Sequence, residues 1–146
     1  MRTDRVLTLP VIPRPRHGRV RVREIMSRPA ATTAASALVS DARNTMEQKG
    51  TSHLVVVDSR GRMAGLLSEE DLRGAGPDEA VRIFMRSAPA SFSPETTIAE
   101  AARILGRERI EFLPVVRNQR PLGMVGVFEV LKMVGNGSLH LRRASI

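Results

Sequence analysis

Ser68 and Asp71 are the residues whose types and spacing point most directly to chemistry. A hydroxyl and a carboxylate three positions apart, just before Leu72, have the spacing of a capping box at a helix start. The carboxylate also lies where the positive end of the helix dipole favours it. A second polar set, Thr51-Ser52-His53, precedes an apolar run, and its hydroxyls and imidazole can donate hydrogen bonds.

The residue sets that most catalytic sites need are missing from this sequence. It has no cysteine, no Gly-x-Ser-x-Gly, no phosphate-binding glycine loop and no His-Glu-x-x-His motif. The three histidines, His17, His53 and His140, are scattered along the chain. We therefore expect a protein that is not an enzyme and holds no metal.

The elements that position these residues form a repeat. Val22-Arg-Glu-Ile-Met26 recurs as Val81-Arg-Ile-Phe-Met85, and Leu54–Val57 recurs as Leu113–Val116, both at an offset of 59. After a turn that is one residue shorter in the second copy, the offset becomes 58. A unit of this length is too long for the common solenoid repeats, so we expect two units that pack as a pseudo-symmetric pair.

Each unit predicts the order β-α-β-β-α, which is an α+β fold. In the first unit, a short extended piece at 31–34 precedes a helix that Gly50 ends. The continuously apolar run Leu54–Val57 predicts a buried strand, and the turn Asp58–Gly61 joins it to a strand at 63–67. A helix over 68–73 closes the unit. The second unit predicts an extended piece at 90–92, a helix opened by the capping box Thr97–Glu100, strands on both sides of 118–120, and a helix over 127–134.

This ordered, repeated pattern resembles the cystathionine-β-synthase (CBS) domain, which occurs in tandem pairs. The resemblance rests on Val22-x-x-Ile-Met26, His53-Leu-Val-Val-Val-Asp58, Gly65-Leu-Leu-Ser68-x-x-Asp71-Leu72 and their second copies. It implies a CBS-domain pair with pseudo-two-fold symmetry: a flexible tail at 1–19, repeats at 20–76 and 77–134, and a tail at 135–146. It also implies a homodimer that senses a ligand and regulates an unknown protein target.

The resemblance further implies a ligand site between the repeats for AMP, ADP, ATP or S-adenosylmethionine, with no obligatory cofactor. The family's ribose feature falls on Ser68 and Asp71, because a carboxylate can accept from both ribose hydroxyls. Leu66 belongs to the same site, the phosphates fall near Ser52 and His53, and the adenine falls near Ala90 and Ile110. No arginine stands at these positions, which favours AMP or S-adenosylmethionine over ATP.

The second copy departs from this pattern. Gly126 and Glu129 replace the hydroxyl and the aspartate, and Glu111 and Phe112 replace Ser52 and His53. A carboxylate and a phenyl ring would repel a phosphate or leave it unsatisfied. We therefore expect one intact site and one degraded second cleft at Glu111, Gly126 and Glu129, whose function the sequence leaves open.

The net charge of +8 is confined to the two ends of the chain. Residues 1–24 carry +5, residues 132–146 carry +3, and residues 25–131 are neutral. The alternative function is therefore a ligand-free dimerisation scaffold whose basic N-terminal arm contacts nucleic acid by counterion release. The segment Val20–Glu24 could instead pack as a strand or linker on the first repeat. Because no apolar run approaches 20 residues and no signal peptide is recognisable, we expect a cytoplasmic protein with no membrane partner.

Overall fold

The computed structural model describes residues 20–87 and 90–135 of the chain. The tail expected at 1–19, with His17, and residues 136–146 of the tail expected at 135–146, with His140, lie outside the described residues. The first half contains one mixed sheet with its helices: β1 (Thr32–Ala34), α2 (Val39–Lys49), β2 (His53–Val57), β3 (Met63–Ser68), the 3-10 turns η3 (Glu70–Leu72) and η4 (Val81–Ile83), and β4 (Arg86–Ser87). Its strand order is β1-β2-β3-β4, with β1 parallel to β2 and the other neighbours antiparallel.

The second half repeats this layout, but single bridges replace the outer strands of its sheet. Its elements are the 3-10 turn η2 (Val22–Glu24), α3 (Ile98–Glu108), the hairpin β5 (Phe112–Arg117) and β6 (Arg120–Gly126), and α4 (Val127–Gly135). Single bridges stand where the first half has its outer strands. Phe92 pairs with Val115 in the parallel direction, and Ser27 pairs with Met124 in the antiparallel direction. The expected α+β fold class is therefore confirmed.

Local sequence signals explain where the long helices begin and end. Gly50 follows α2 in the left-handed conformation with a φ of 63°, which glycine adopts without steric cost. At the start of α3, the Thr97 hydroxyl accepts from the Glu100 N–H at 3.1 Å, and the Glu100 carboxylate accepts from the Thr97 N–H at 2.9 Å. This reciprocal pair is the predicted capping box.

The helix expected over 68–73 is wrong in length and type. The structure has only the 3-10 turn η3 there, and the backbone is already extended at Arg73, which follows it. Gly74 then adopts a positive φ of 80°, which an α-helix cannot accommodate. In the second repeat the corresponding segment does form a helix, α4, in which aliphatic and aromatic residues replace this turn sequence.

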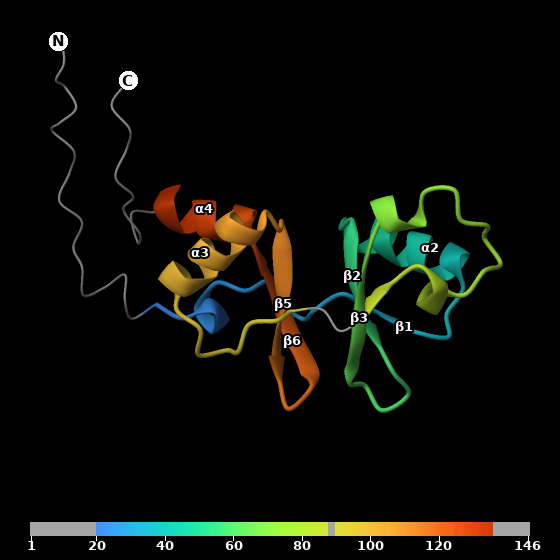
Figure 1. Ribbon diagram of the computed structural model, residues 1–146, viewed down its shortest axis with the longest axis horizontal. Coiled ribbons are helices and arrows are strands. Elements are labelled where there is room, and N and C mark those ends of the chain that lie inside the picture. Colours follow the sequence, from blue (N-terminus) through green and yellow to red (C-terminus); the bar gives the residue numbers. More distant parts are fainter. Residues whose placement is uncertain (1–19, 88–89, 136–146) are drawn as a thin grey trace, which may run out of the picture.

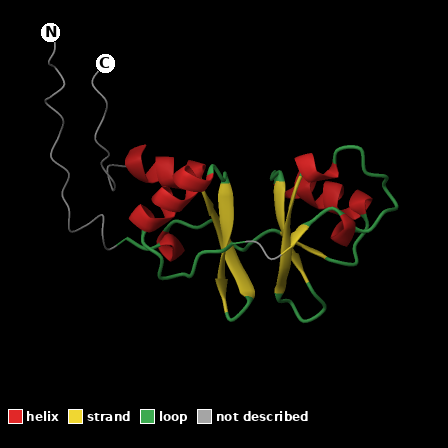
Figure 2. Cartoon of the chain, in the orientation of Figure 1, coloured by secondary structure: helices red, strands yellow, loops and turns green. Residues whose placement is uncertain are grey.

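The molecule is built in layers along its long axis. Figure 1 shows α2 on the outside of the first sheet and α3 with α4 on the outside of the β5–β6 hairpin. The strands of the two halves therefore face each other across the middle of the molecule, as the yellow arrows of Figure 2 show. Each half has its own buried core, one around Leu54, Val56 and Leu67 and the other around Leu113, Val115 and Val125.

The two repeats exchange the segments that precede them. Val22, at the start of the first repeat, is fully buried in the core of the second half, and its N–H donates to the Thr96 carbonyl at 2.8 Å. Val81, its counterpart, is fully buried in the first half and donates to the Ala37 carbonyl at 2.8 Å. The packing of Val20–Glu24 on the first repeat is therefore wrong, because this segment packs on the second. The boundaries 20–76 and 77–134 stay a prediction about the sequence repeats.

Candidate functional site

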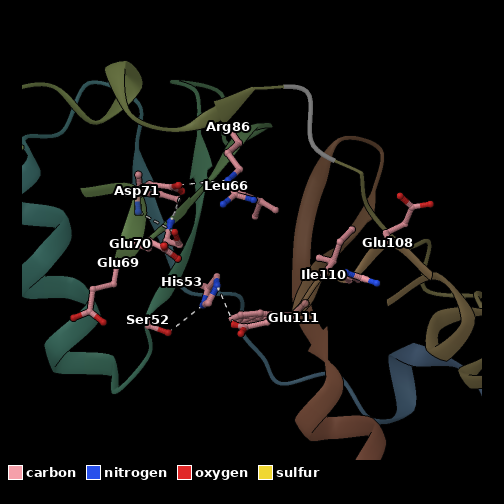
Figure 3. A pocket seen from close by; sticks show the side chains of 14 residues that line it. Ser52, His53, Leu66, Glu69, Glu70, Asp71, Arg86, Glu108, Ile110 and Glu111 are labelled. Carbon is pink, nitrogen blue, oxygen red and sulfur yellow. Dashed lines mark hydrogen bonds and ion pairs between the residues drawn. The ribbon is translucent and has the colours of Figure 1, made fainter. Parts of the chain in front are cut away.

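A cavity of about 480 Å³ lies between the two halves, where β3 and η3 face the connection from α3 to β5. Figure 3 shows side chains from both halves converging on it. We call it the first cavity. Its lining residues are Ser52, His53, Leu66, Leu67, Ser68, Glu69, Glu70, Asp71, Arg86, Glu108, Arg109, Ile110, Glu111 and Phe112.

The Ser68–Asp71 pair forms a capping box at one wall of this cavity. The Asp71 Oδ2 atom accepts from the Ser68 N–H at 2.9 Å, and the Ser68 hydroxyl accepts from the Asp71 N–H at 3.1 Å. The other carboxylate oxygen, Oδ1, has only a longer contact to Arg86 Nε at 3.4 Å. The capping box therefore fixes the Asp71 carboxylate through Oδ2, and Oδ1 remains an acceptor that faces the weakly held Arg86 guanidinium group.

His53 lies at the centre of the interface between the halves. Its Nδ1 is 3.1 Å from the Ser52 hydroxyl, and its Nε2 is 4.0 Å from Glu111 Oε1. Its ring packs edge-on against Phe112. Burial lowers the pKa of His53 below 6.5, and the nearby Arg86 lowers it further, while Glu111 and Asp71 partly offset this effect. The imidazole is therefore neutral at pH 7 and can donate or accept, depending on its tautomer.

The apolar part of the cavity comes from both repeats. Leu66 on β3 and Ile110, just before β5, approach it from opposite sides (Figure 3). Six of the seven predicted ligand residues thus line this one cavity. Ala90 does not: it lies in the loop before Phe92, outside the lining residues. Its counterpart in the other repeat, Ala31, lines a different cavity.

Sequence reasoning missed the two guanidinium groups of the first cavity. Arg86 reaches it from β4, and Arg109 reaches it from the residue that ends α3. The expectation of a site without arginine is therefore wrong. Arg86 belongs in sequence to the segment that leads into the second repeat. Because the repeats exchange these segments, Arg86 packs against the first repeat, and the sequence alone did not indicate this.

A second cavity of about 340 Å³ is the pseudo-symmetric counterpart of the first. It is lined by Ser27, Arg28, Pro29, Ala31, Lys49, Gly50, Thr51, His53, Phe112, Met124 and Glu129. Glu111, which we expected in this second cleft, instead lines the first cavity. Neighbouring residues at the start of a strand project to opposite sides. Phe112 therefore contacts both cavities, whereas Glu111 lines only the first of them.

Gly126, the counterpart of Ser68 in the second repeat, has no room for a side chain. A Cβ atom at Gly126 would lie 2.6 Å from both the Glu111 carbonyl oxygen and the Phe112 Cβ. Glu129 still accepts from the Gly126 N–H at 2.8 Å, which preserves half of the capping box. The loss predicted from Gly126 thus has a steric cause.

Within the residues that the structure describes, no helix combines the length and apolar character needed to cross a bilayer. The same residues contain no group of three or more histidine, aspartate or glutamate side chains arranged to hold a metal ion.

Comparison with known proteins identifies the repeats. The CBS domain family matches residues 22–78 and 80–136. The chain is 26% identical over 119 residues to the A-adding tRNA nucleotidyltransferase of Aquifex aeolicus, which covers 80% of this chain and 14% of that protein. The first three curated relatives are all much longer, and the chain spans between 14% and 24% of their length.

Solved structures share the fold. The crystal structure of CBSX2 in complex with AMP has a TM-score of 0.72 at 21% identity, covering 80% of this chain and 97% of that one. The CBS domain pair of protein MJ0100, in complex with 5′-methylthioadenosine and S-adenosyl-L-methionine, has a TM-score of 0.72 at 20% identity, covering 81% and 98%. With two matched repeats over most of its length, this chain belongs to the CBS domain family.

Proposed function

We propose that this chain is a regulatory CBS pair that binds an adenosyl ligand in the first cavity. The observation that carries the proposal is that a single cavity between the repeats gathers the Ser68–Asp71 pair, the Ser52–His53 pair and apolar surface from both repeats. The complexes of CBSX2 with AMP and of MJ0100 with adenosyl compounds support the ligand class.

The arrangement supports a proposed role for each part of the cavity. Asp71 Oδ1 is the acceptor for a ribose hydroxyl, because its contact with Arg86 is long and easily exchanged. Leu66 and Ile110, on opposite walls, offer apolar surface to the adenine ring. His53 is the cross-strand partner of Ser68, so a group on the 5′ carbon of the ribose would meet Ser52 and His53.

The mechanism that we propose is a population shift. A ligand that contacts Asp71 from one repeat and Ile110 from the other favours the arrangement of the halves that makes both contacts. A target protein would then recognise this arrangement.

The chain has no proposed catalytic role, and its cytoplasmic location stays a prediction. The rival function in nucleic-acid binding depends on residues 1–19, which lie outside the described residues.

We also propose that the pair forms a homodimer through α4. Val127, Phe128 and Leu131 expose 45%, 67% and 54% of their surface on this helix. At the corresponding places the first repeat has Glu69, Glu70 and Arg73, so the apolar face belongs to the second repeat alone. Large exposed apolar side chains grouped on one helix are typical of a surface that another molecule covers.

Isothermal titration calorimetry of the full chain tests the ligand proposal. Wild-type protein should bind AMP or S-adenosylmethionine, and Asp71→Ala should bind at least tenfold more weakly because the ribose acceptor is gone. Asp71→Asn, which keeps one carbonyl acceptor for the Ser68 N–H, controls for loss of the capping box. Absence of binding of any adenosyl compound at millimolar concentration would overturn the proposal, and equal binding by both variants and the wild type would overturn the assignment of Asp71.

A further inference from the structure

The first cavity carries an excess of negative charge. Its wall holds five carboxylates and two guanidinium groups: Glu69, Glu70, Asp71, Glu108 and Glu111 against Arg86 and Arg109. Three of the carboxylates have a guanidinium partner. Asp71 pairs with Arg86, while Glu70 and Glu108 pair with Arg73 and Arg107, which lie outside the lining. The charges of the remaining two therefore matter most to a ligand.

Glu111 stands out because of its position. In the part of the chain that the structure describes, its carboxylate has no lysine or arginine partner within 4.0 Å, and it lies 4.0 Å from His53 Nε2. The Glu111 side chain is 84% exposed and the His53 side chain 23% exposed. Figure 3 shows the two side by side at the edge of the cavity where Ser52 also lies.

His53 does not cancel this charge. Burial holds the pKa of His53 below its ordinary value, so the imidazole is neutral at pH 7. The edge of the cavity near Ser52 therefore offers a hydroxyl, a neutral ring and one full negative charge. The cations Arg86 and Arg109 also line the cavity, and Arg86 has a long contact of 3.4 Å with Asp71.

The comparison between repeats shows that this charge is specific to one cavity. The counterpart of Glu111 in the first repeat is Ser52, and the counterpart of Glu108 is Lys49. The second cavity accordingly contains Lys49 and Arg28, with Glu129 as its one acidic lining residue. Two cavities of the same fold thus present opposite charges, and the difference comes from particular side chains.

We propose that Glu111 makes the first cavity select adenosyl ligands that carry a positive charge on the 5′ substituent, a sulfonium, over those that carry a 5′ phosphate. This inference rests on the proposed function, because it assumes that the ribose lies at Ser68 and Asp71. With the ribose there, the 5′ substituent lies beside His53 and within a few ångströms of the Glu111 carboxylate. A sulfonium is attracted at that distance, and a phosphate is repelled.

The expected effect is moderate because Glu111 is exposed. Charges near the surface interact through water and are screened by salt, so single pairs there contribute little. We expect Glu111 to change the dissociation constant of each charged ligand about two- to fivefold, in opposite directions for the two charge types.

Calorimetric titration with two matched pairs of ligands tests the inference. S-adenosylmethionine and S-adenosylhomocysteine differ by one methyl group and the sulfonium charge, and 5′-methylthioadenosine and AMP differ in the charge of the 5′ group. Wild-type protein should bind S-adenosylmethionine more tightly than S-adenosylhomocysteine, and 5′-methylthioadenosine more tightly than AMP. In Glu111→Gln, the dissociation constant of AMP divided by that of S-adenosylmethionine should fall at least fourfold. The dissociation constant of the uncharged 5′-methylthioadenosine should stay unchanged.

Glu47→Gln is the matched control, because it removes one exposed carboxylate on α2 that lines neither cavity. Its ligand ratios should equal those of the wild type. AMP binding as tightly as S-adenosylmethionine to the wild type, or an unchanged ratio in Glu111→Gln, would overturn the inference and leave the proposed function standing. If no adenosyl compound binds, the proposed function fails and the inference fails with it.

Discussion

The His53 imidazole packs edge-on against the Phe112 ring, with the ring centroids 3.7 Å apart and the planes at 77°. These residues occupy the same position in the two repeats, 59 residues apart, and each starts its central strand region at β2 or β5. Both also line both cavities. The pair therefore marks the pseudo-two-fold axis and forms part of the wall of both cavities.

The environment of His53 predicts a pH dependence of stability. Its pKa is lowered in the folded protein, mainly by burial, so the unfolded chain takes up the proton first as the pH falls. The free energy of unfolding should thus be fully retained above pH 6.5 and should decrease as the pH falls below that value. Urea denaturation at pH 7.5 and pH 5 should show this decrease in the wild type and a smaller one in His53→Gln.

Asp58 and Glu100, whose pKa values are also shifted, affect the free energy of unfolding in a lower pH range than His53 does. Hydrogen bonds lower the pKa of Asp58 and of Glu100 below 3.8 and 4.5, so the stability that they contribute is lost at lower pH. Identical losses between pH 7.5 and 5 in the wild type and His53→Gln would show that the imidazole is not desolvated as described.

The close packing around Gly126 predicts that a serine at this position destabilises the protein. Gly126→Ser would restore the hydroxyl that Ser68 supplies in the first repeat, but its Cβ would lie 2.6 Å from backbone and side-chain atoms of Glu111 and Phe112. Overpacking of this kind costs about 1–3 kcal/mol, measurable as a lower urea midpoint. Gly106→Ala is the control: no atom lies within 4 Å of its Cβ, and helix propensity should raise stability by about 0.5–1 kcal/mol. Wild-type stability in Gly126→Ser would contradict the close approach.

The apolar face of α4 predicts an oligomeric state. Light scattering coupled to gel filtration should give about twice the chain mass for the wild type. Phe128→Glu, which places a charge on the most exposed residue of the face, should shift the population towards the monomer. Ile83→Glu is the matched control, because Ile83 is 62% exposed and lies on η4 in the other half. A monomeric wild type, or equal effects of both variants, would argue against dimerisation through α4.

The sequence predicts the parts of the fold that depend on local patterns. The apolar runs at 54–57 and 113–116, the Thr97 capping box and the Gly50 helix end each require only neighbouring residues, and all are present. The exchange of leading segments is different in kind. Val22 and Val81 each stand in a Val-Arg-x-x-Met segment, so this shared local pattern does not indicate which core each one enters.

The candidate site shows the same division. Ser68 and Asp71 lie together because they are three residues apart, and the hairpin places His53 opposite Ser68. Arg86 reaches the cavity because its strand pairs with β3 opposite Leu66, whereas Arg109 and Glu111 reach it through the packing of one half against the other. The guanidinium groups and Glu111 were therefore not predicted for this cavity, whereas the predicted hydroxyl and apolar residues do line it, and their role in binding stays a prediction.

The most direct measurement for the central claim is a two-dimensional NMR titration of the isotope-labelled full chain with S-adenosylmethionine. The account predicts that the largest amide shifts fall on residues of the first cavity, at Ser52, His53, Ser68, Asp71 and Ile110. Residues confined to the second cavity, such as Lys49 and Glu129, should change little. Shifts centred on Lys49 and Glu129, or no shifts at millimolar ligand, would contradict it.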